Sequence, residues 1–201
     1  MFNAATYRAT PRDLALIAVF TALTAVLAAP TVTISGIAPI TLQTLGFMLA
    51  ASLLGYPWGG ASVALYVLLI AVGLPIGAGG RGGLAVITGP TGGFLIGGII
   101  GALVTGWLVD KWGRTNPVTV GLANIIGLMV IVYAIGLPWL GWRTGSGLFA
   151  KLTLGLQFVP GDLIKVVITS LVVVMVARAY PPIARRGSAA AAEKAVSEKR
   201  A

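Results

Sequence analysis

A carboxylate and an ammonium group stand three positions apart in an otherwise apolar stretch, at Asp162 and Lys165. The Pro160-Gly161 dipeptide before them predicts the start of a helix, because proline is tolerated in the first helical turn. Asp162 would then lie at the helix N-terminus, where free N–H groups and the helix dipole favour an anion, with Lys165 on the same face. Two interpretations fit this pattern: an ion pair that only tightens helix packing, or a ligand-binding site.

The composition is that of a membrane protein. Of the 201 residues, 57% are hydrophobic and only 9% are charged, and the 28 glycines follow no collagen-like period. A soluble domain carries about 25% charged residues, so this chain could not cover a surface exposed to water. The glycines indicate close helix packing and cavities lined by backbone. Charged residues inside a membrane are costly and usually functional, which favours the ligand-site interpretation of Asp162 and Lys165.

The sequence lacks the residues that several classes of catalytic and metal site require. The sequence contains no cysteine and no histidine, which excludes thiolate or imidazole metal sites, Cys or Ser–His nucleophiles and disulfides. The five acidic residues do not cluster and no Walker A pattern is present, so neither paired-carboxylate catalysis nor ATP hydrolysis is expected. The prediction is a protein that is not an enzyme and that carries no metal or cofactor.

Six apolar segments organise the chain between a polar lead and a basic tail. They cover residues 13–29, 41–55, 61–73, 93–109, 118–137 and 161–180. The second and third are short for a bilayer, which needs about 20 residues per helix, so we expect them to borrow flanking residues or to be shielded by loops. We predict an all-α membrane protein with six transmembrane helices over residues 1–182. Residues 183–201 are predicted to form a cytoplasmic tail, disordered or partly helical.

The distribution of lysine and arginine predicts the orientation. Ten of these residues lie in the two tails and in the turns at 55–60 and 110–114, whereas the opposite loops carry only Arg81, Arg143 and Lys151. Positive charge is enriched on the cytoplasmic side, so both termini are predicted to be cytoplasmic in a multi-pass protein of the cell membrane. The basic residues have no interleaved aromatic side chains, which favours contact with anionic lipid over nucleic acid.

Three irregular loops would then face outward. Residues 30–40 suit short extended structure, residues 75–92 are too glycine-rich for a stable helix, and residues 139–156 combine an aromatic loop with a short amphipathic stretch. Non-helical backbone at membrane depth is tolerated only where it is buried in protein or lines a cavity. These loops and the Asp162–Lys165 pair therefore converge at the outer face, where a captured solute would bind.

Two weaker patterns add candidate residues. Gln43, beside Thr41, is a polar group at the start of the second segment, and it suits a helix cap and a ligand contact equally well. Ala18 and Ala22 are small residues four positions apart, which make a flat helix face that another helix can approach closely. This face suits either internal packing or the docking of an external partner.

Four motifs carry a family resemblance: P-I-T-L-Q-T at 39–44, G-G-R-G-G-L at 79–84, G-P-T-G-G-F at 89–94 and F-V-P-G-D-L-I-K at 158–165. In this order, across residues 13–180, they resemble the BioY family, the biotin-specific substrate-binding (S) components of energy-coupling-factor (ECF) transporters. The resemblance implies a six-helix membrane protein that binds biotin from outside. Uptake would require a transmembrane coupling protein and a pair of ABC-type ATPases.

The resemblance also implies roles for particular residues. Ala18 and Ala22 match the family's docking face for the coupling protein, and Asp162 and Lys165 match its ligand contacts. The chemistry of biotin is compatible with these roles, because a carboxylate can accept from the ureido N–H groups and an ammonium can donate to the ureido oxygen.

The carboxylate of biotin needs a further partner, because the Asp162–Lys165 pair is net neutral. Arg81 and the backbone amides of residues 75–92 are the candidates. Aromatic walls would suit the apolar ring, although ordinary packing also explains the candidates Phe47, Tyr66, Phe94 and Trp139. The predicted binding residues are thus Asp162, Lys165, Gln43, Arg81, Thr41, Phe94 and Tyr66.

Two other functions stay open at this point. A stand-alone vitamin facilitator would use the same features without ATPase partners, and a single sequence does not reveal its partners. A membrane assembly subunit that binds no ligand is an alternative from another class. Biotin binding separates the assembly subunit from the other two, and uptake with and without ATPases separates those two from each other.

Overall fold

The computed structural model describes residues 9–32, 40–145 and 147–180 of the chain. Within these ranges the backbone is mostly helical, which confirms the predicted all-α class. The elements are α1 (Pro11–Ala28), β1 (Thr31–Val32), β2 (Ile40–Thr41), α2 (Gln43–Leu54), α3 (Trp58–Ala71), α4 (Leu84–Thr88), α5 (Gly92–Trp112), α6 (Pro117–Asn124), η2 (Ile125–Ile131), α7 (Val132–Thr144) and α8 (Leu148–Ala179). The π-helical segment η2 joins α6 to α7 in one long rod, Pro117–Thr144.

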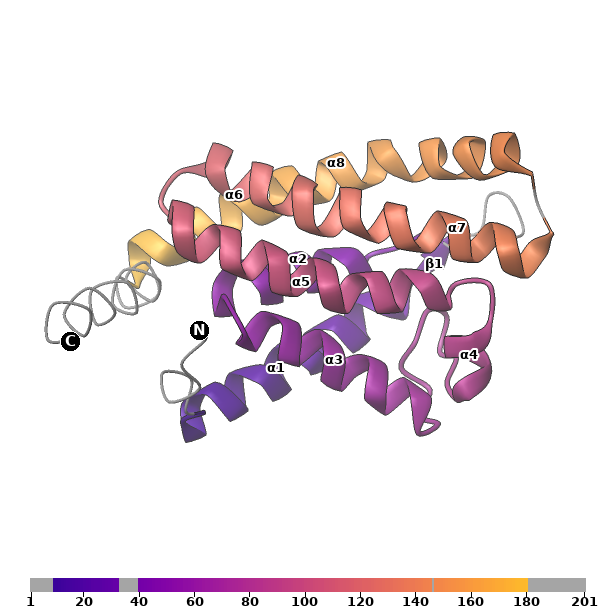
Figure 1. Ribbon diagram of the computed structural model, residues 1–201. Helices are drawn as coiled ribbons and strands as arrows, with labels where there is room; N and C mark the ends of the chain where they lie inside the picture. The colour runs from indigo at the N-terminus through magenta and orange to yellow at the C-terminus, as the bar shows by residue number, and fades with distance from the viewer. Residues whose placement is uncertain (1–8, 33–39, 146, 181–201) are drawn as a thin grey trace, which may run out of the picture.

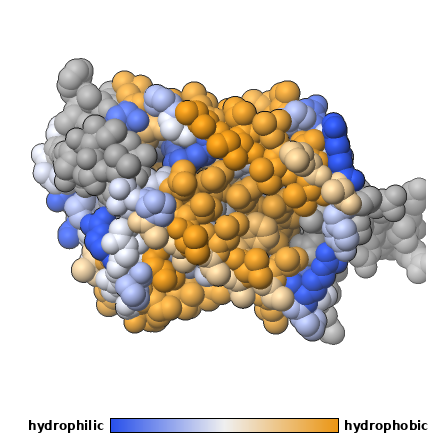
Figure 2. Space-filling view, turned by 180° about the vertical axis from the view of Figure 1, so that it is seen from behind, coloured by the Kyte–Doolittle hydropathy of each residue, from blue (hydrophilic) through white to orange (hydrophobic). Residues whose placement is uncertain are grey.

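Four helices in the described part of the chain are long and apolar enough to cross a membrane: Pro11–Ala28, Gly92–Trp112, Pro117–Thr144 and Gly155–Ala179. Helices α2 and α3 are apolar but shorter, as their sequence segments predicted. Figure 2 shows a broad hydrophobic band across one face of the molecule, with hydrophilic residues along both edges. This distribution suits a bilayer between two aqueous phases.

The first helix begins where the sequence supplies a capping box. Thr10 Oγ1 accepts from the backbone N–H of Asp13 (3.2 Å), and Asp13 Oδ2 accepts from the backbone N–H of Thr10 (3.1 Å). Pro11 occupies the first turn, where its missing N–H costs nothing. The buried face of α1, which includes Ile17 and Thr21, packs against α2 and α3, and its opposite face is exposed.

Glycines allow α5 to lie in the centre of the bundle, against α2, α3, η2 and α7 (Figure 1). A Cβ atom at Gly101 would collide with the carbonyl oxygen of Gly127 in η2. Beside this contact, Thr105 donates its hydroxyl to the carbonyl of Ala123 (3.2 Å), which lies in α6 just before the π-helical segment. The glycines therefore provide the close helix packing that the composition predicted.

Two prolines that the sequence predicts to interrupt helices lie inside them. Helix α7 continues through Pro138 to its end, and α8 runs through Pro160 without a break. Neighbouring helices and local adjustments of hydrogen bonding can satisfy the backbone groups that a proline frees in a membrane helix. The expected outer loop at 139–156 is therefore mostly helical. Asp162 lies well inside α8, so the predicted position at a helix N-terminus is wrong.

The two ends of the bundle are built differently (Figure 1). At one end the start of α1 meets the end of α8, where the guanidinium of Arg12 donates to the Tyr180 hydroxyl (3.1 Å). At the other end lie the β1–β2 sheet, α4 and the connection from α7 to α8. Thr31 pairs with Thr41 in the sheet, as the extended structure predicted for this loop requires. Residues 33–39 and the predicted tail at 183–201 lie outside the described residues.

Candidate functional site

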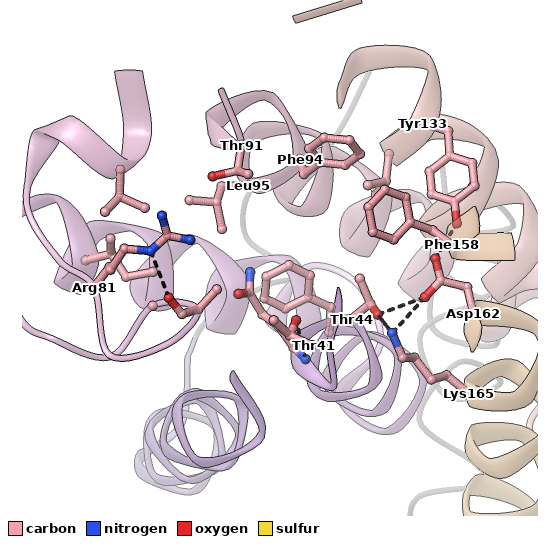
Figure 3. Close-up of a pocket in the computed structure, with 17 residues that line it drawn as sticks. Thr41, Thr44, Arg81, Thr91, Phe94, Leu95, Tyr133, Phe158, Asp162 and Lys165 are labelled. Carbon is pink, nitrogen blue, oxygen red and sulfur yellow. Dashed lines mark hydrogen bonds and ion pairs between the residues drawn. The ribbon is translucent and has the colours of Figure 1, made fainter. Parts of the chain in front are cut away.

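A pocket lies at the end of the bundle that carries the sheet and α4 (Figure 3). It encloses about 860 Å³ of atom-free space, part of it open to solvent, between α2, α3, α5, α7, α8 and the connection that contains α4. Six of the seven predicted binding residues line this pocket: Thr41, Gln43, Arg81, Phe94, Asp162 and Lys165. The structure thus brings together residues from four separate stretches of the sequence.

Asp162 and Lys165 form one polar side of the pocket with two further side chains. Lys165 Nζ donates to Asp162 Oδ1 (2.9 Å) and to Thr44 Oγ1 (2.8 Å). Thr44 Oγ1 donates to the same carboxylate oxygen (3.2 Å), and the Tyr133 hydroxyl donates to Asp162 Oδ2. Asp162 is 5% exposed and Lys165 is 7% exposed, so each charge depends on the other and on these neutral groups for compensation.

Three helices position this four-residue cluster. Asp162 and Lys165 project from one side of α8, Thr44 comes from the first turn of α2, and Tyr133 from the start of α7. An ionised carboxylate offers about four lone-pair sites and an ammonium has three N–H donors. The contacts among the described residues use three of the carboxylate's lone-pair sites and two of the ammonium's N–H donors. The charge pair therefore retains an acceptor site and a donor for a bound molecule.

Arg81 stands on the opposite side of the pocket from the charge pair (Figure 3). Its Nε donates to the carbonyl of Ala78 (3.1 Å), within its own turn. Gly79 and Gly80 have φ angles of 66° and 72°, and glycine adopts this left-handed backbone without strain. Among the described residues no carboxylate pairs with Arg81. Its guanidinium is therefore available to an anionic group.

Apolar side chains line the space between these two polar sides. Phe94 and Phe158 meet edge to face, with 6.3 Å between ring centroids and 62° between ring planes. Phe47, Ile70 and Leu95 add to the same lining. An apolar pocket with a few polar groups at defined places is the usual form of a small-molecule site. This pocket suits a solute with an apolar body and polar groups at both ends.

Gln43 and Thr41 enter the pocket at the start of α2. Gln43 is the first residue of that helix, and its backbone N–H donates to the Thr41 hydroxyl (3.2 Å). Thr41, at the end of β2, therefore supplies the hydroxyl acceptor at this helix start, and the Gln43 side chain is left to line the pocket. Ala18 and Ala22 lie elsewhere, on the exposed face of α1.

Two aromatic candidates do not reach the pocket wall. Tyr66 is fully buried, packs edge to face against Phe47 at 5.8 Å between ring centroids, and donates its hydroxyl to the Ile76 carbonyl (2.9 Å). Trp139 donates from Nε1 to the Gly89 carbonyl (2.9 Å). Both side chains therefore support loop backbone behind the pocket, whereas Phe47 lines it as the sequence suggested.

Sequence reasoning missed Tyr133 and Phe158 and did not select Thr44. Tyr133 stands in an apolar stretch 29 positions before Asp162. It is the second residue of α7, just beyond the π-helical segment. No residue pattern in the sequence predicted the change from π-helix to α-helix at this point. Phe158 belongs to the motif at 158–165, which could have marked it as a candidate.

Comparison with known proteins assigns this architecture to a family. A model of the BioY family matches residues 3–182. The biotin transporter BioY of Rhizobium etli is 41% identical over 184 residues, covering 87% of this chain and 98% of that protein. The probable biotin transporter BioY of Bacillus subtilis is 34% identical over 169 residues, covering 83% and 91% of the two chains.

A solved structure shares the fold. The crystal structure of the S-component for biotin from an ECF-type ABC transporter has a TM-score of 0.80 and 30% identity, over 85% of this chain and 95% of that one. The relatives are biotin transporters and the S-component of a transporter, which confirms the prediction that this chain is not an enzyme. The family match and the relatives together confirm the resemblance seen in the sequence motifs: the chain belongs to the BioY family.

Proposed function

We propose that this protein binds biotin in the pocket described above and delivers it for uptake as the S component of an ATP-driven ECF importer. The observation that carries the proposal is the arrangement of the pocket, with a buried charge pair on one side, Arg81 on the other and an apolar space between them. The names of its relatives and of the solved S-component supply the ligand.

The charge pair suits the ureido group of biotin. This group has two N–H donors and one carbonyl acceptor, and the pair retains a carboxylate acceptor site and an ammonium donor. The Asp162 carboxylate accepts a ureido N–H and Lys165 donates to the ureido oxygen, with Thr44 and Tyr133 orienting the two charged groups. Hydrogen bonds to charged groups are the stronger ones, so this end anchors the ligand.

Arg81 suits the other end of the molecule. The carboxylate of biotin carries a negative charge that the net-neutral pair cannot compensate, and the Arg81 guanidinium has terminal N–H groups for it. The apolar ring and chain lie between, against Phe94 and Phe158. Thr41 and Gln43 supply further polar groups along the wall.

Equilibrium binding of radiolabelled biotin to the purified protein tests this proposal. Saturable binding that unlabelled biotin competes away is expected, with Asp162→Asn as a matched variant of weaker affinity. No saturable binding would instead support the alternative of an assembly subunit without ligand. Uptake into cells with and without the coupling protein and ATPases then distinguishes an ECF component from a stand-alone facilitator.

The coupling protein would dock on the exposed face of α1. Ala18 and Ala22 are exposed and lie beside the buried residues Ile17 and Thr21, so the small side chains point away from the bundle and not into its core. Small residues let a partner helix approach closely, and this face has no partner within the described part of the chain. The exposed position supports docking over internal packing.

A separation of functions tests this docking face. Ala18→Trp and Ala22→Trp should leave biotin affinity unchanged and abolish co-purification with the coupling protein, because the bulky ring prevents close helix approach. Met175→Trp, at another exposed apolar position, is the matched control and should assemble normally. Loss of binding and assembly together in the alanine variants would rule out a dedicated docking face.

The proposed topology has six spans, formed by α1, α2, α3, α5, the α6–η2–α7 rod and α8, with both termini in the cytoplasm. The charge distribution supports it, and so does the end of the bundle where Arg12 meets Tyr180. Lys111 also stacks on Trp107 at that end, 5.1 Å from the ring centroid, a pairing that suits a membrane interface.

Single cysteines test the orientation, because the chain has none of its own. Thr144→Cys and Thr115→Cys place thiols at exposed positions at opposite ends of the bundle. An impermeant maleimide added to intact cells should label the first and spare the second. Labelling of the second from outside would reverse the proposed orientation.

A further inference from the structure

Tyr66 is a buried side chain that the binding site itself does not use. It lies on α3 behind the pocket wall, fully buried, with its ring against Phe47. Its hydroxyl donates to the carbonyl oxygen of Ile76 at 2.9 Å. Packing alone would be served equally well by phenylalanine, so the hydroxyl and its one acceptor need a separate explanation.

The acceptor belongs to the peptide group that closes the Arg81 turn. The Ile76 carbonyl and the Gly77 N–H are two ends of one planar peptide unit. Tyr66 donates to the carbonyl, and the N–H donates to the carbonyl oxygen of Arg81 at 2.8 Å. One hydroxyl on α3 therefore fixes the plane of the peptide that holds the backbone of Arg81.

The rest of the turn leaves Arg81 little freedom. Gly80 N–H donates to the Gly77 carbonyl (2.9 Å), and Arg81 Nε donates to the Ala78 carbonyl (3.1 Å). A Cβ atom on Gly77 would lie 2.7 Å from the Arg81 carbonyl oxygen, so the turn closes only with glycine there. Position and orientation of the guanidinium thus depend on this peptide group.

Helix α3 holds the far side of the same loop as well. The Gly83 N–H donates to the carbonyl of Ile70 at 2.7 Å, one turn of helix beyond Tyr66. The segment from residue 76 to residue 83 is therefore attached to α3 at both ends, and Arg81 projects from between the two attachments. Of these two attachments, the one at Ile76 is made by a side chain and can be removed by a single substitution.

We infer that Tyr66 is a positioning residue for the ligand's carboxylate: through the Ile76–Gly77 peptide it sets the place of Arg81 without touching the ligand. This inference rests on the proposed function, in which Arg81 receives that carboxylate. It separates two parts of ligand recognition, because no hydrogen bond among the described residues joins the Asp162–Lys165 side of the pocket to this peptide. Removing the hydroxyl should therefore weaken binding only of ligands that carry the negative charge.

Competition binding of biotin and of biotinamide, in which a neutral amide replaces the carboxylate, tests this separation. Tyr66→Phe should weaken biotin binding about three- to tenfold, which is within the range for one hydrogen bond, and should change biotinamide binding less than about twofold. Gly77→Ala opens the same turn from its other side and should show the same selectivity. In an Arg81→Gln background, Tyr66→Phe should have no further effect on biotin affinity.

Two tyrosine variants serve as matched controls. Tyr133→Phe removes a hydroxyl from the Asp162 side and should weaken both ligands alike, because both carry the ureido group. Tyr180→Phe, at the other end of the bundle, should change neither. Equal losses for the two ligands in Tyr66→Phe, no loss at all, or loss of all binding would each overturn the inference. A wild-type protein that binds neither ligand would instead overturn the proposed function, and the inference with it.

Discussion

Two charge pairs with similar spacing lie at opposite ends of the bundle. Asp162 and Lys165 face each other across one turn of α8 at the pocket, and Asp110 and Arg114 do so at the end of α5. Lys165 and Arg114 are both buried, at 7% and 1% exposure. Both pairs join an aspartate to a basic residue one helical turn further along the chain, at i,i+3 and i,i+4.

The two pairs differ in the other groups that they contact. Arg114 Nε donates to the carbonyl of Ser52 (2.8 Å) near the end of α2, and Asp110 Oδ2 accepts from the N–H of Tyr56 (2.9 Å) before α3. Helix ends leave such backbone groups unpaired, so this pair ties the α2–α3 corner to α5. The pocket pair has side-chain partners, Thr44 and Tyr133, and a cavity beside it. Backbone partners make the Asp110–Arg114 pair structural. The Asp162–Lys165 pair borders a cavity, which leaves it open to the ligand that we propose.

Breaking the structural pair should have the largest effect. Arg114→Met leaves the Ser52 carbonyl without its donor and Asp110 without its cation, and should lower the free energy of unfolding by about 3–5 kcal/mol. Denaturant unfolding in detergent measures this loss. The protein that remains folded should bind biotin with nearly unchanged affinity. Unchanged stability, or a stable protein with weakened binding, would contradict the contrast between the two pairs.

Replacing the Asp162–Lys165 pair should instead lower biotin affinity and leave stability nearly unchanged. Asp162→Asn with Lys165→Met removes both charges together, so the fold should keep most of its stability. Biotin affinity should fall by about 1.5–3 kcal/mol, or about ten- to over a hundredfold, for each charge-assisted hydrogen bond lost. Isothermal titration and thermal unfolding of the two single variants and the double variant measure both quantities. A well-folded double variant with wild-type affinity would remove this pair from the binding site.

A smaller effect is expected at the glycine beside the structural pair. Gly55 has φ of 73°, and a Cβ atom there would collide with the side chains of Asp110 and Arg114. Gly55→Ala should lower the free energy of unfolding by more than about 1 kcal/mol. Gly113→Ala is the matched control, because Gly113 has φ of 91° and nothing within 4 Å of its Cβ position. Equal losses in the two variants would mean that backbone strain alone, and not the pair, is responsible.

The smallest effect is expected at the hydroxyl that bridges the pocket pair. Thr44→Val keeps the shape of the side chain and removes one bond to Lys165 and one to Asp162. Biotin affinity should fall by about 0.5–1.5 kcal/mol, or about two- to tenfold. The two charged groups lose the hydroxyl that orients them, but the ion pair between them remains. Direct binding measurements on the two proteins test this. An affinity loss as large as that of the double variant would make Thr44 a direct ligand contact.

Most of the helices could be predicted from the sequence, because their length and ends are local properties. The first segment, expected at 13–29, is α1, and the fourth, expected at 93–109, lies within α5. Capping residues, glycines and apolar runs act over a few positions along the chain. Six of the residues predicted from the sequence to bind ligand also line the pocket, and all six lie within the motifs of the family resemblance.

The prolines inside α7 and α8 show that local sequence preferences do not decide where these helices end. Pro138 and Pro160 each remove one backbone donor, and in an isolated helix each would favour a break. Within the bundle both α7 and α8 continue, because packing against neighbouring helices outweighs the local cost. The position of Asp162 inside α8, and not at its start, follows from this balance.

Tertiary structure alone decided which side chains complete the site. Thr44 reaches Asp162 across 118 positions of sequence and Tyr133 reaches it across 29, and no helical or strand period relates such distant residues. The same packing turns Tyr66 away from the pocket, toward the Ile76 carbonyl. The apolar helices, the class of protein and the charged groups of the proposed site follow from residue types and their order along the chain. Their partners were decided by how the helices pack, because hydrogen bonds form wherever packing brings a donor to an acceptor.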